Sequence, residues 1–401
     1  MAQSPSMAAL AMSATTGGTE LTQAEAELWC HNFGYLKSMA LQCAIKLGIP
    51  TAIHRLGGAA SLAELCSTLP VAASKRPCLS RIMTFLAASG IFREKKKIIP
   101  DAEPLYHLTT ASRLLVDDDD SDDAGGRRTC VAQLLTLCSS PSYFAASQNL
   151  AAWLQKEDAD SDGEAAAAAT PFAMAHGGAG FYDAVGRDAA FGACFDGAMG
   201  SDTGFVSGIV VREHGEVFDG VATVVDVGGH DGTAARAIAK AFPHVRCTTV
   251  LDLPRVVDAA MATATADGND DGTVEFVAGD MREFIPPADA VLFKDSDTVS
   301  KCVLHNWSDE DCVQILKRAK KAISAREPKG KVVITEVVLA SPSNKQTLEA
   351  QLLMDLCMMV VLEGKERTEE AWHKIFLDAG FTRYKITPIS GTTRSLIEVF
   401  P

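Results

Sequence analysis

The sequence predicts an α/β protein whose core is a doubly wound, mostly parallel sheet of the Rossmann-like kind, preceded by a smaller helical domain. Short β-branched runs alternate with helical segments from Val221 onward, which is the pattern of βαβ units. A glycine-rich turn directly follows the first of these runs, and helical periodicity dominates the chain before residue 115. Because 401 residues exceed the usual length of one domain, two units are expected.

The N-terminal domain is predicted at residues 24–115, after a flexible tail at residues 1–23. The tail is rich in Ala, Ser, Thr and Gly and has no basic segment ahead of an apolar run, so a secretory signal is not expected. An apolar stripe spaced by alternating steps of four and three residues then predicts a helix that begins near Glu25 and ends at Gly48.

Further short elements complete this domain. Ser61 and Glu64 have the spacing of a capping box, which predicts a second helix, and a third is expected at 79–88. Candidate strands at 91–92 and 106–108 make the unit winged-helix-like. We expect it to serve either as a dimer interface or as a packing appendage.

The rest of the chain is predicted to form one larger domain at residues 130–401. An acidic loop at 116–129, in which positions 117 to 123 hold six Asp, separates it from the first domain, because like charges repel and cannot pack. A second biased segment at 156–170 is also expected to be exposed. Residues 130–217 are expected to be mainly helical.

The sheet is predicted within residues 218–401. Five β-branched runs are expected to form its parallel strands, at 221–227, 248–253, 273–277, 288–294 and 331–339. Two further runs, at 384–389 and 395–400, follow the last helix with only a short turn between them. These are expected to form an antiparallel hairpin at the end of the sheet.

Composition excludes several classes of partner. The formal net charge of −14 argues against nucleic acid and anionic membrane surfaces, and no apolar stretch reaches the length that spans a bilayer. The 11 cysteines include no C-x-x-C pair, so we expect neither a zinc site nor a disulfide framework. Free thiols fit the reducing cytoplasm.

The glycine-rich turn indicates a nucleoside cofactor. In the run VVDVGGHDG at 224–232, the turn lies between the first strand and a helix that begins near Thr233, where the backbone can approach a nucleotide closely. Counting G-x-G-x-x-G from Gly228 puts His at 230 and Thr at 233, so the dehydrogenase fingerprint fails, and no Walker sequence is present.

Asp252 closes the second strand, where a carboxylate can accept both hydroxyls of a ribose. The alternative roles are a structural turn for Gly228 and a helix N-cap for Asp252. We favour a nucleoside cofactor without a pyrophosphate, because the turn and the acid occur together at the ends of neighbouring strands.

These motifs, with others further along, resemble those of the class II plant O-methyltransferases, which methylate caffeic acid, flavonoids and related phenols. The matching segments occur in family order: DVGG at 226–229, LDLP at 251–254, GDM at 279–281, LHNWSDE at 304–310, GKV at 330–332 through Glu336, and GKERT at 364–368. The resemblance covers nearly the whole chain outside the tail and the acidic loops.

The resemblance implies S-adenosyl-L-methionine as the cofactor and a small phenolic metabolite as the acceptor. It implies a homodimer formed through the N-terminal helices, substrate helices at 130–217 and a cofactor-binding sheet at 218–401. The residues that it assigns to the cofactor are Gly228, Asp252, Asp280, Met281 and a lysine, those that it assigns to catalysis are His305, Glu336 and Glu366, and those that it places against the acceptor ring are Met199 and Met358.

The reaction explains why a histidine is needed. A phenol has a pKa of about 10 and is a poor nucleophile until it loses its proton. A neutral imidazole, with an ordinary pKa of about 6.5, can take that proton and accelerate the reaction by roughly a hundred- to ten-thousand-fold. A carboxylate from Glu366 or Glu336 would hold the other ring nitrogen of His305. No metal is required.

Three departures from the family pattern matter. His230 stands where the family usually has Gly, and Asn306 stands where part of the family has Asp. About seven residues are inserted before His305, with Lys294 at one end and Lys301 at the other. Lys301 keeps the family spacing to His305 and is our prediction for the cofactor lysine, with Lys294 as the alternative.

Other functions stay open at this point. A hydroxyindole methyltransferase acting on N-acetylserotonin would share every motif above. A catalytically impaired homologue that only binds cofactor is a third hypothesis, because the insertion either bulges harmlessly at the end of the strand or displaces His305. A dehydrogenase is disfavoured by the missing third glycine.

Overall fold

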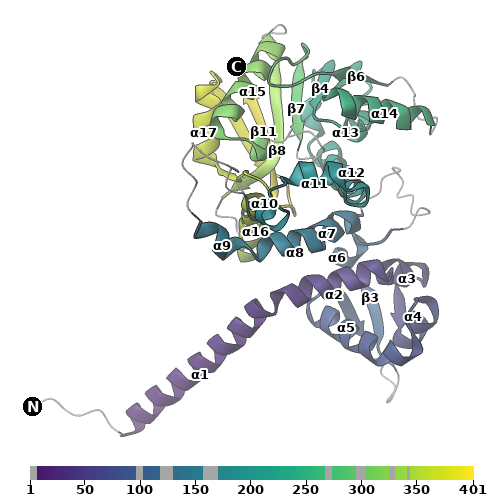
Figure 1. Ribbon diagram of the computed structural model, residues 1–401, viewed down its shortest axis with the longest axis vertical. Helices are drawn as coiled ribbons and strands as arrows, with labels where there is room; N and C mark the ends of the chain where they lie inside the picture. Colours follow the sequence, from purple (N-terminus) through teal and green to yellow (C-terminus); the bar gives the residue numbers. More distant parts are fainter. Residues whose placement is uncertain are drawn as a thin grey trace, which may run out of the picture. The chain divides into compact units, whose positions relative to one another are not determined.

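The computed structural model describes residues 7–95, 103–117, 130–156, 170–266, 273–294, 304–324, 330–340 and 344–401. The chain divides into two compact units, Met1–Asp117 and Asp118–Pro401 (Figure 1). The segments 118–129, 157–169 and 295–303 lie outside the described residues, so the predicted acidic loop, the second biased segment, the insertion and Lys301 are not tested.

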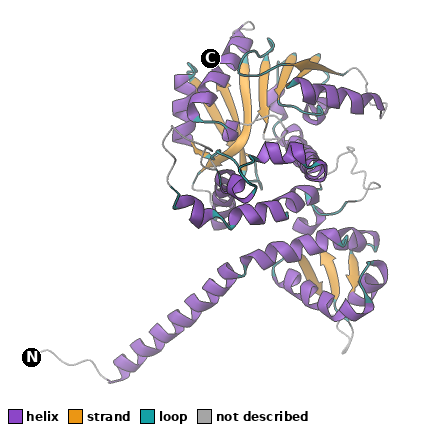
Figure 2. Cartoon of the chain, viewed as in Figure 1, coloured by secondary structure: helices purple, strands orange, loops and turns teal. Residues whose placement is uncertain are grey.

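The first unit combines short helices with a small antiparallel sheet (Figure 2). Its helices are α1 Met7–Asn32, α2 Gly34–Lys46, α3 Ile49–Arg55, α4 Leu62–Thr68, the 3-10 helix Ala73–Lys75, α5 Arg76–Ala88 and α6 Thr110–Arg113. Its strands are β1 Ala59–Ser61, β2 Phe92–Lys95 and β3 Leu105–Leu108, in the order β1-β3-β2. The capping box is confirmed, because Ser61 N–H donates to Glu64 Oε2 at 2.7 Å and Glu64 N–H donates to Ser61 Oγ at 3.3 Å.

The start of the chain differs from the prediction. Helix α1 begins at Met7, within the segment 1–23 that we expected to be a flexible tail. Residues 7–32 contain no proline and many strong helix formers such as Ala, Leu, Glu and Gln, so helix propensity can extend the helix backwards. The single helix expected from Glu25 to Gly48 is instead divided at Phe33, whose φ of −91° and ψ of 13° interrupt the regular helix.

The second unit contains the predicted mixed sheet. Its strands are β4 Thr223–Val227, β5 Cys247–Asp252, β6 Val274–Ala278, β7 Ala290–Lys294, β8 Lys331–Leu339, β9 Arg367–Thr368, β10 Arg383–Pro388 and β11 Arg394–Phe400. The order is β10-β11-β8-β7-β4-β5-β6, with β9 beside β8. Strands β4 to β8 pair in parallel, while β10 and β11 form the predicted antiparallel hairpin.

Helices cover both faces of this sheet. The predicted helical region contains α7 Ala132–Cys138, α8 Pro141–Ser147, α9 Leu150–Leu154, α10 Pro171–Ala175, α11 Phe181–Arg187 and α12 Ala189–Glu213, followed by the 3-10 helix Gly215–Phe218. The remaining helices are α13 Thr233–Ala241, α14 Pro254–Ala266, the 3-10 helix Leu304–Asn306, α15 Asp309–Ser324, α16 Lys345–Val361 and α17 Glu369–Asp378.

Alternating residues of each strand point to opposite faces, and they enter two different cores. Val225 and Phe293 pack with α15 and α17. Val224 and Leu292 pack with α12 and α13. The central strands are therefore buried on both sides, which explains their nearly continuous apolar sequence.

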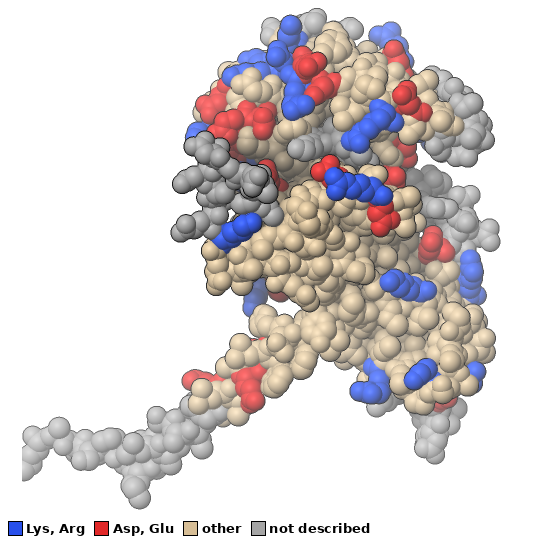
Figure 3. Space-filling view, in the orientation of Figure 1, with Lys and Arg blue, Asp and Glu red and all other residues tan. Residues whose placement is uncertain are grey.

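The charged surface contains residues of both signs. On the face drawn in Figure 3, Lys and Arg side chains of the second unit are interspersed with Asp and Glu side chains and form no continuous basic surface within the described part of the chain. No helix in the described ranges combines the length and the apolar character needed to cross a membrane.

Candidate functional site

The predicted site residues gather at the carboxyl edge of the parallel strands, where ligands bind in open α/β sheets. Gly228 directly follows β4, Asp252 is the last residue of β5, and Lys294 is the last residue of β7. Lys294 pairs with Thr335 of β8, so Glu336 lies one residue further towards the same edge. The topology thus brings together residues that are far apart in the sequence.

The turn after β4 is held in the left-handed backbone region. The φ angles of Gly228, His230 and Gly232 are 72°, 52° and 78°, and His230 is the one non-glycine residue with positive φ in the described part of the chain. Histidine tolerates this region better than most residues. His230 therefore adopts a backbone conformation at this position that glycine adopts most readily.

Asp252 is fixed against this turn. Its side chain is buried, His230 N–H donates to Oδ2 at 3.1 Å, and Leu253 N–H donates to Oδ1 at 2.7 Å. Gly228 N–H also donates to Leu251 O at 2.8 Å. These bonds join the first turn to the end of the second strand and fix the orientation of the Asp252 carboxylate.

A buried carboxylate lies beneath the turn. A Cβ on Gly229 would lie 2.6 Å from Asp226 Oδ2, so glycine is needed there. Burial raises the pKa of Asp226 to about 7, while the Lys294 ammonium lowers it and the carboxylates of Asp252 and Asp231 raise it further. Two carboxylates and one ammonium therefore set the charge around Asp226.

Lys294 is buried, and its Nζ donates to Thr203 Oγ1 of α12 at 3.0 Å. Of the two lysines considered from the sequence, it is the one within the described residues. Its ammonium donates to a side chain of α12 and interacts with the charge of Asp226. Lys294 therefore lies beneath the glycine-rich turn.

Asp280 and Met281 follow β6 but have different surroundings. Arg282 forms an ion pair with Asp280 at 2.6 Å, and this hydrogen-bonded contact holds the pKa of Asp280 below its usual value. The Arg282 guanidinium also lies 5.3 Å from the ring centre of Trp307. Met281 is buried in the core that contains Leu251.

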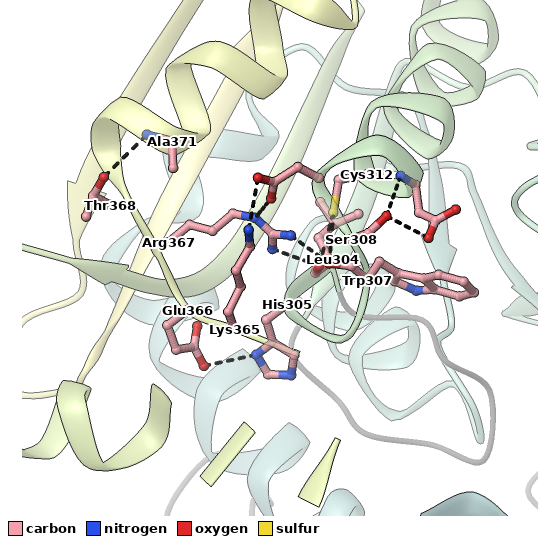
Figure 4. A network of polar contacts seen from close by, with 12 residues as sticks. Leu304, His305, Trp307, Ser308, Cys312, Lys365, Glu366, Arg367, Thr368 and Ala371 are labelled. Atoms are coloured by element: carbon pink, nitrogen blue, oxygen red, sulfur yellow. Dashed lines mark hydrogen bonds and ion pairs between the residues drawn. The ribbon is translucent and has the colours of Figure 1, made fainter. Parts of the chain in front are cut away.

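His305 lies in the 3-10 helix Leu304–Asn306 and is 1% exposed. Its Nδ1 atom lies 3.1 Å from Glu366 Oε1 (Figure 4). Its backbone N–H donates to Glu336 Oε1 at 3.1 Å. The two glutamates therefore contact different parts of His305: Glu366 contacts the imidazole ring, and Glu336 accepts from the main-chain N–H.

This arrangement assigns the ring nitrogens. An ionised carboxylate can only accept a hydrogen bond, so Nδ1 of His305 donates to Glu366. In the neutral ring the lone pair then lies on Nε2. The donor atoms of His305, Glu336 and Glu366 all lie within 4.8 Å of one another, which is also a set that a metal ion could use. The geometry by itself is compatible with base catalysis and with metal binding.

Several residues that hold His305 were missed by the sequence analysis. Lys365 N–H donates to His305 O at 2.9 Å, and a Cβ on Gly364 would lie 2.5 Å from the same oxygen. The buried Arg367 donates to Leu304 O at 3.0 Å and to Trp307 O at 2.6 Å (Figure 4). The signal was present in the segment GKERT, of which only Glu366 had been given a role.

The predicted acceptor residues lie on two helices of the same unit. Met199 of α12 is buried in a cluster with Val360 and Val361 of α16. Met358, also buried, is on α16 two residues before Val360. On α16, Asp355 accepts from Glu366 N–H at 2.9 Å.

Asn306 connects the histidine segment to α11. Its Nδ2 donates to Tyr182 Oη at 3.2 Å. The ring of Tyr182 packs against Phe181 and Phe195. An aromatic cluster is therefore hydrogen-bonded to Asn306, the residue that follows His305. Sequence spacing alone could not indicate this contact.

Two family models match the chain. An O-methyltransferase domain matches residues 148–382, and an O-methyltransferase dimerisation domain matches residues 29–118.

Curated relatives match almost end to end. A flavonoid O-methyltransferase-like protein of Oryza sativa subsp. japonica is 42% identical, over 95% of this chain and 96% of the relative. The trans-resveratrol di-O-methyltransferase of Vitis vinifera is 41% identical, over 95% and 97%. Acetylserotonin O-methyltransferase 3 of Oryza sativa subsp. japonica is 42% identical, over 96% and 97%.

Solved structures share the fold. Human N-acetylserotonin methyltransferase in complex with S-adenosylmethionine has a TM-score of 0.71 and 19% identity, over 94% of this chain and 97% of that chain. A methyltransferase of calicheamicin biosynthesis, in its S-adenosylhomocysteine-bound form, has a TM-score of 0.72 and 23% identity, over 95% and 98%.

Proposed function

The chain belongs to the class II plant O-methyltransferase family, and we propose that it methylates a hydroxyl of a small phenolic compound with His305 as the general base. Its matches to the O-methyltransferase domain and to curated relatives establish the family. It is an O-methyltransferase that uses S-adenosylmethionine. The observation that supports the proposed mechanism best is the buried contact between His305 Nδ1 and Glu366 Oε1.

The described residues fit the cofactor. S-adenosylmethionine supplies, when bound, a methyl group on a positively charged sulfur. Gly228 at the turn and Asp252 at the end of β5 would hold its nucleoside part, because the turn and the acid are joined by the bond from His230 N–H to Asp252.

Asp280 and Met281 remain our proposal for the adenine, which would lie beside the end of β6. For the lysine, Lys294 supports the turn from below by compensating the charge of Asp226. Lys301, predicted from its spacing to His305, lies outside the described residues, and its contact with the cofactor stays a prediction.

The base is prepared by its neighbours. Glu366 holds the Nδ1–H of His305, which leaves Nε2 to accept the proton of the acceptor hydroxyl. The imidazolium that results is stabilised by the Glu366 carboxylate. Glu336 and the main-chain contacts of Lys365 and Arg367 keep the ring at a fixed position. His305 has then taken the proton from the oxygen to which S-adenosylmethionine, held by Gly228 and Asp252, would supply the methyl group.

The acceptor is proposed to lie against α12 and α16, with Met199 and Met358 against its ring. Relatives named for flavonoid, resveratrol and resorcinol methylation support a phenolic acceptor. A hydroxyindole is the second candidate, because acetylserotonin O-methyltransferase 3 of Oryza sativa subsp. japonica is as similar to this chain, at 42% identity, as the flavonoid-type relative.

We also propose a homodimer formed by residues 24–115, with residues 130–401 as the catalytic domain. The match of residues 29–118 to a dimerisation domain supports this division. A reducing cytoplasm is proposed as the location, because the 11 cysteines include no C-x-x-C pair and show no pattern of a disulfide framework.

The test is methyl transfer from labelled S-adenosylmethionine to a panel of flavonoids, phenylpropanoids, resorcinols and hydroxyindoles. Transfer that is lost in His305→Ala but kept in a control, His373→Ala on the exposed face of α17, supports the proposal. If the wild type binds S-adenosylhomocysteine by calorimetry but transfers no label to any acceptor, the impaired homologue is the better description.

A further inference from the structure

The start of β11 makes directional contacts with both helices that carry the proposed acceptor residues. The Arg394 guanidinium forms an ion pair with Asp202 of α12 at 2.8 Å, with the two side chains 10% and 6% exposed. Asp202 is three residues after Met199, so both lie on the same side of the helix. The position of Met199 is thus linked to Arg394.

The neighbouring residue binds the second helix. Gln351 of α16 donates from Nε2 to Thr393 O at 3.2 Å and to Val338 O at 3.1 Å. Gln351 is buried, and Met358 is seven residues, or about two turns, further along the same helix. Thr393 therefore contacts α16 and Arg394 contacts α12, so that both helices are joined to the sheet at two adjacent residues.

Hydrogen bonds hold this point of the chain, which adjoins the strand that supplies Glu336. Arg394 N–H donates to Thr392 Oγ1 at 3.1 Å, and Arg394 O accepts from Ile389 N–H at 3.0 Å. The next residue, Ser395, is paired with Glu336 of β8. The strand that supplies Glu336 and the two acceptor helices are consequently joined at residues 393–395, the last residue before β11 and its first two.

Stability alone does not explain such a pair. Buried ion pairs often contribute little net stability compared with apolar residues of the same volume, whereas they fix the relative position of the elements that they join. The apolar contacts of Met199 with α16 have no preferred direction. The ion pair of Arg394 and the hydrogen bond to Thr393 O are directional, so they can fix the positions of α12 and α16 along the sheet.

We propose that Arg394 is a positioning residue for methyl transfer, which through Asp202 and the adjacent Thr393 carbonyl holds Met199 and Met358 at a fixed distance from His305. This inference rests on the proposed function, because it assumes that the acceptor lies against α12 and α16. Arg394 itself touches neither the acceptor nor the cofactor in this proposal.

The test uses the double variant Asp202→Asn/Arg394→Met, which removes the charges of both members of this ion pair. The matched control is Lys331→Met/Glu398→Gln, because that ion pair joins β8 and β11 at 2.8 Å with side chains 11% and 12% exposed. Arg394→Lys keeps the charge but not the planar fork of donors.

The double variant is expected to raise the KM for the acceptor by about tenfold or more, since small displacements of positioning groups have effects of this size. The KM for S-adenosylmethionine is expected to stay within about twofold and Arg394→Lys to be intermediate. Hydrogen exchange of the amides of α12 is expected to be faster in the double variant and unchanged in the control.

An unchanged acceptor KM and unchanged exchange of α12 in the double variant would overturn the inference. So would equal effects in the control, which would indicate a general loosening of the sheet. If the wild type methylates no acceptor, the proposed function fails, but the exchange comparison still decides whether Arg394 holds α12. If the double variant does not fold, Arg394→Lys decides by the same two measurements.

Discussion

Nδ1 of His305 and Oε1 of Glu366 lie 3.1 Å apart, in side chains that are 1% and 0% exposed. The two residues are 61 positions apart in the sequence. A carboxylate held this way fixes the tautomer of the ring and stabilises the imidazolium, which is the property that a general base for a phenol needs.

Glu366→Gln tests this contact. The amide keeps the shape of the side chain but can donate to Nδ1, which would favour the wrong tautomer. We expect kcat to fall by about a hundred- to ten-thousand-fold, while the KM for S-adenosylmethionine changes little. The matched control is Glu363→Gln, three residues away and exposed. A kcat equal to that of the wild type would rule out a role for Glu366 at the ring.

Arg367 should matter more for stability than its neighbour Lys365, although both contact Asp309 at 2.8 Å and 2.9 Å. Arg367 is buried and also satisfies the carbonyls of Leu304 and Trp307. We expect Arg367→Met to lower the free energy of unfolding by about 3 kcal/mol, measured by urea denaturation.

Lys365→Met removes an exposed ion pair and should cost less than about 1 kcal/mol. Equal losses for the two variants would show that the carbonyls of Leu304 and Trp307 do not depend on Arg367.

The fold was predictable where the sequence pattern is local and repeated. All the expected strand runs contain a strand, because short runs rich in β-branched residues between turn residues favour the extended conformation. The helical start at Met7 was missed because the Ser, Thr and Gly residues of this segment are poor helix formers and outweighed its alanines in the prediction.

The sequence predicted which residues belong to the site, but it did not predict which of them contact one another. Glu336 and Glu366 could not be distinguished as partners of the ring, since that depends on the register between β8 and β9. The bond from Lys294 to Thr203 spans 91 positions and leaves no local signal. Arg367 was overlooked because two of the three hydrogen-bond partners of its side chain are main-chain carbonyls, which every residue has, and the third, Asp309, is 58 positions away.

Asp226 should make stability depend on pH. Its pKa is about 7 in the folded chain against an ordinary value of 3.8, so between about pH 4 and pH 7 the folded state holds the proton more tightly than the unfolded state. By linkage, this contribution is present below pH 4 and is lost as the pH rises towards 7.

The loss is expected to be about 4 kcal/mol across that window, because each unit of the pKa difference is worth about 1.4 kcal/mol, and Asp226→Asn, which stays neutral, should abolish it. The measurement is the difference in unfolding free energy between wild type and variant at pH 5 and pH 7.5. Parallel pH curves for the two proteins would contradict the raised pKa of Asp226.

Chelation should leave the reaction unaffected. The donor atoms of His305, Glu336 and Glu366 could bind a metal ion, but in our account each glutamate already holds a part of His305. Dialysis against EDTA is expected to change the rate of methyl transfer by less than about twofold. Loss of activity that returns on addition of Zn²⁺ would instead assign the three residues to a metal centre.

The central claim is that His305 takes the proton of the acceptor hydroxyl, and the most direct test is to vary the acidity of that hydroxyl. In His305→Ala, an acceptor whose phenol is already ionised at the assay pH needs no base and should lose less than about tenfold in kcat, whereas a matched phenol with a pKa near 10 should lose about a hundred- to ten-thousand-fold. Equal losses for the two acceptors would contradict the role of His305 as a base and would leave it only the task of binding the acceptor.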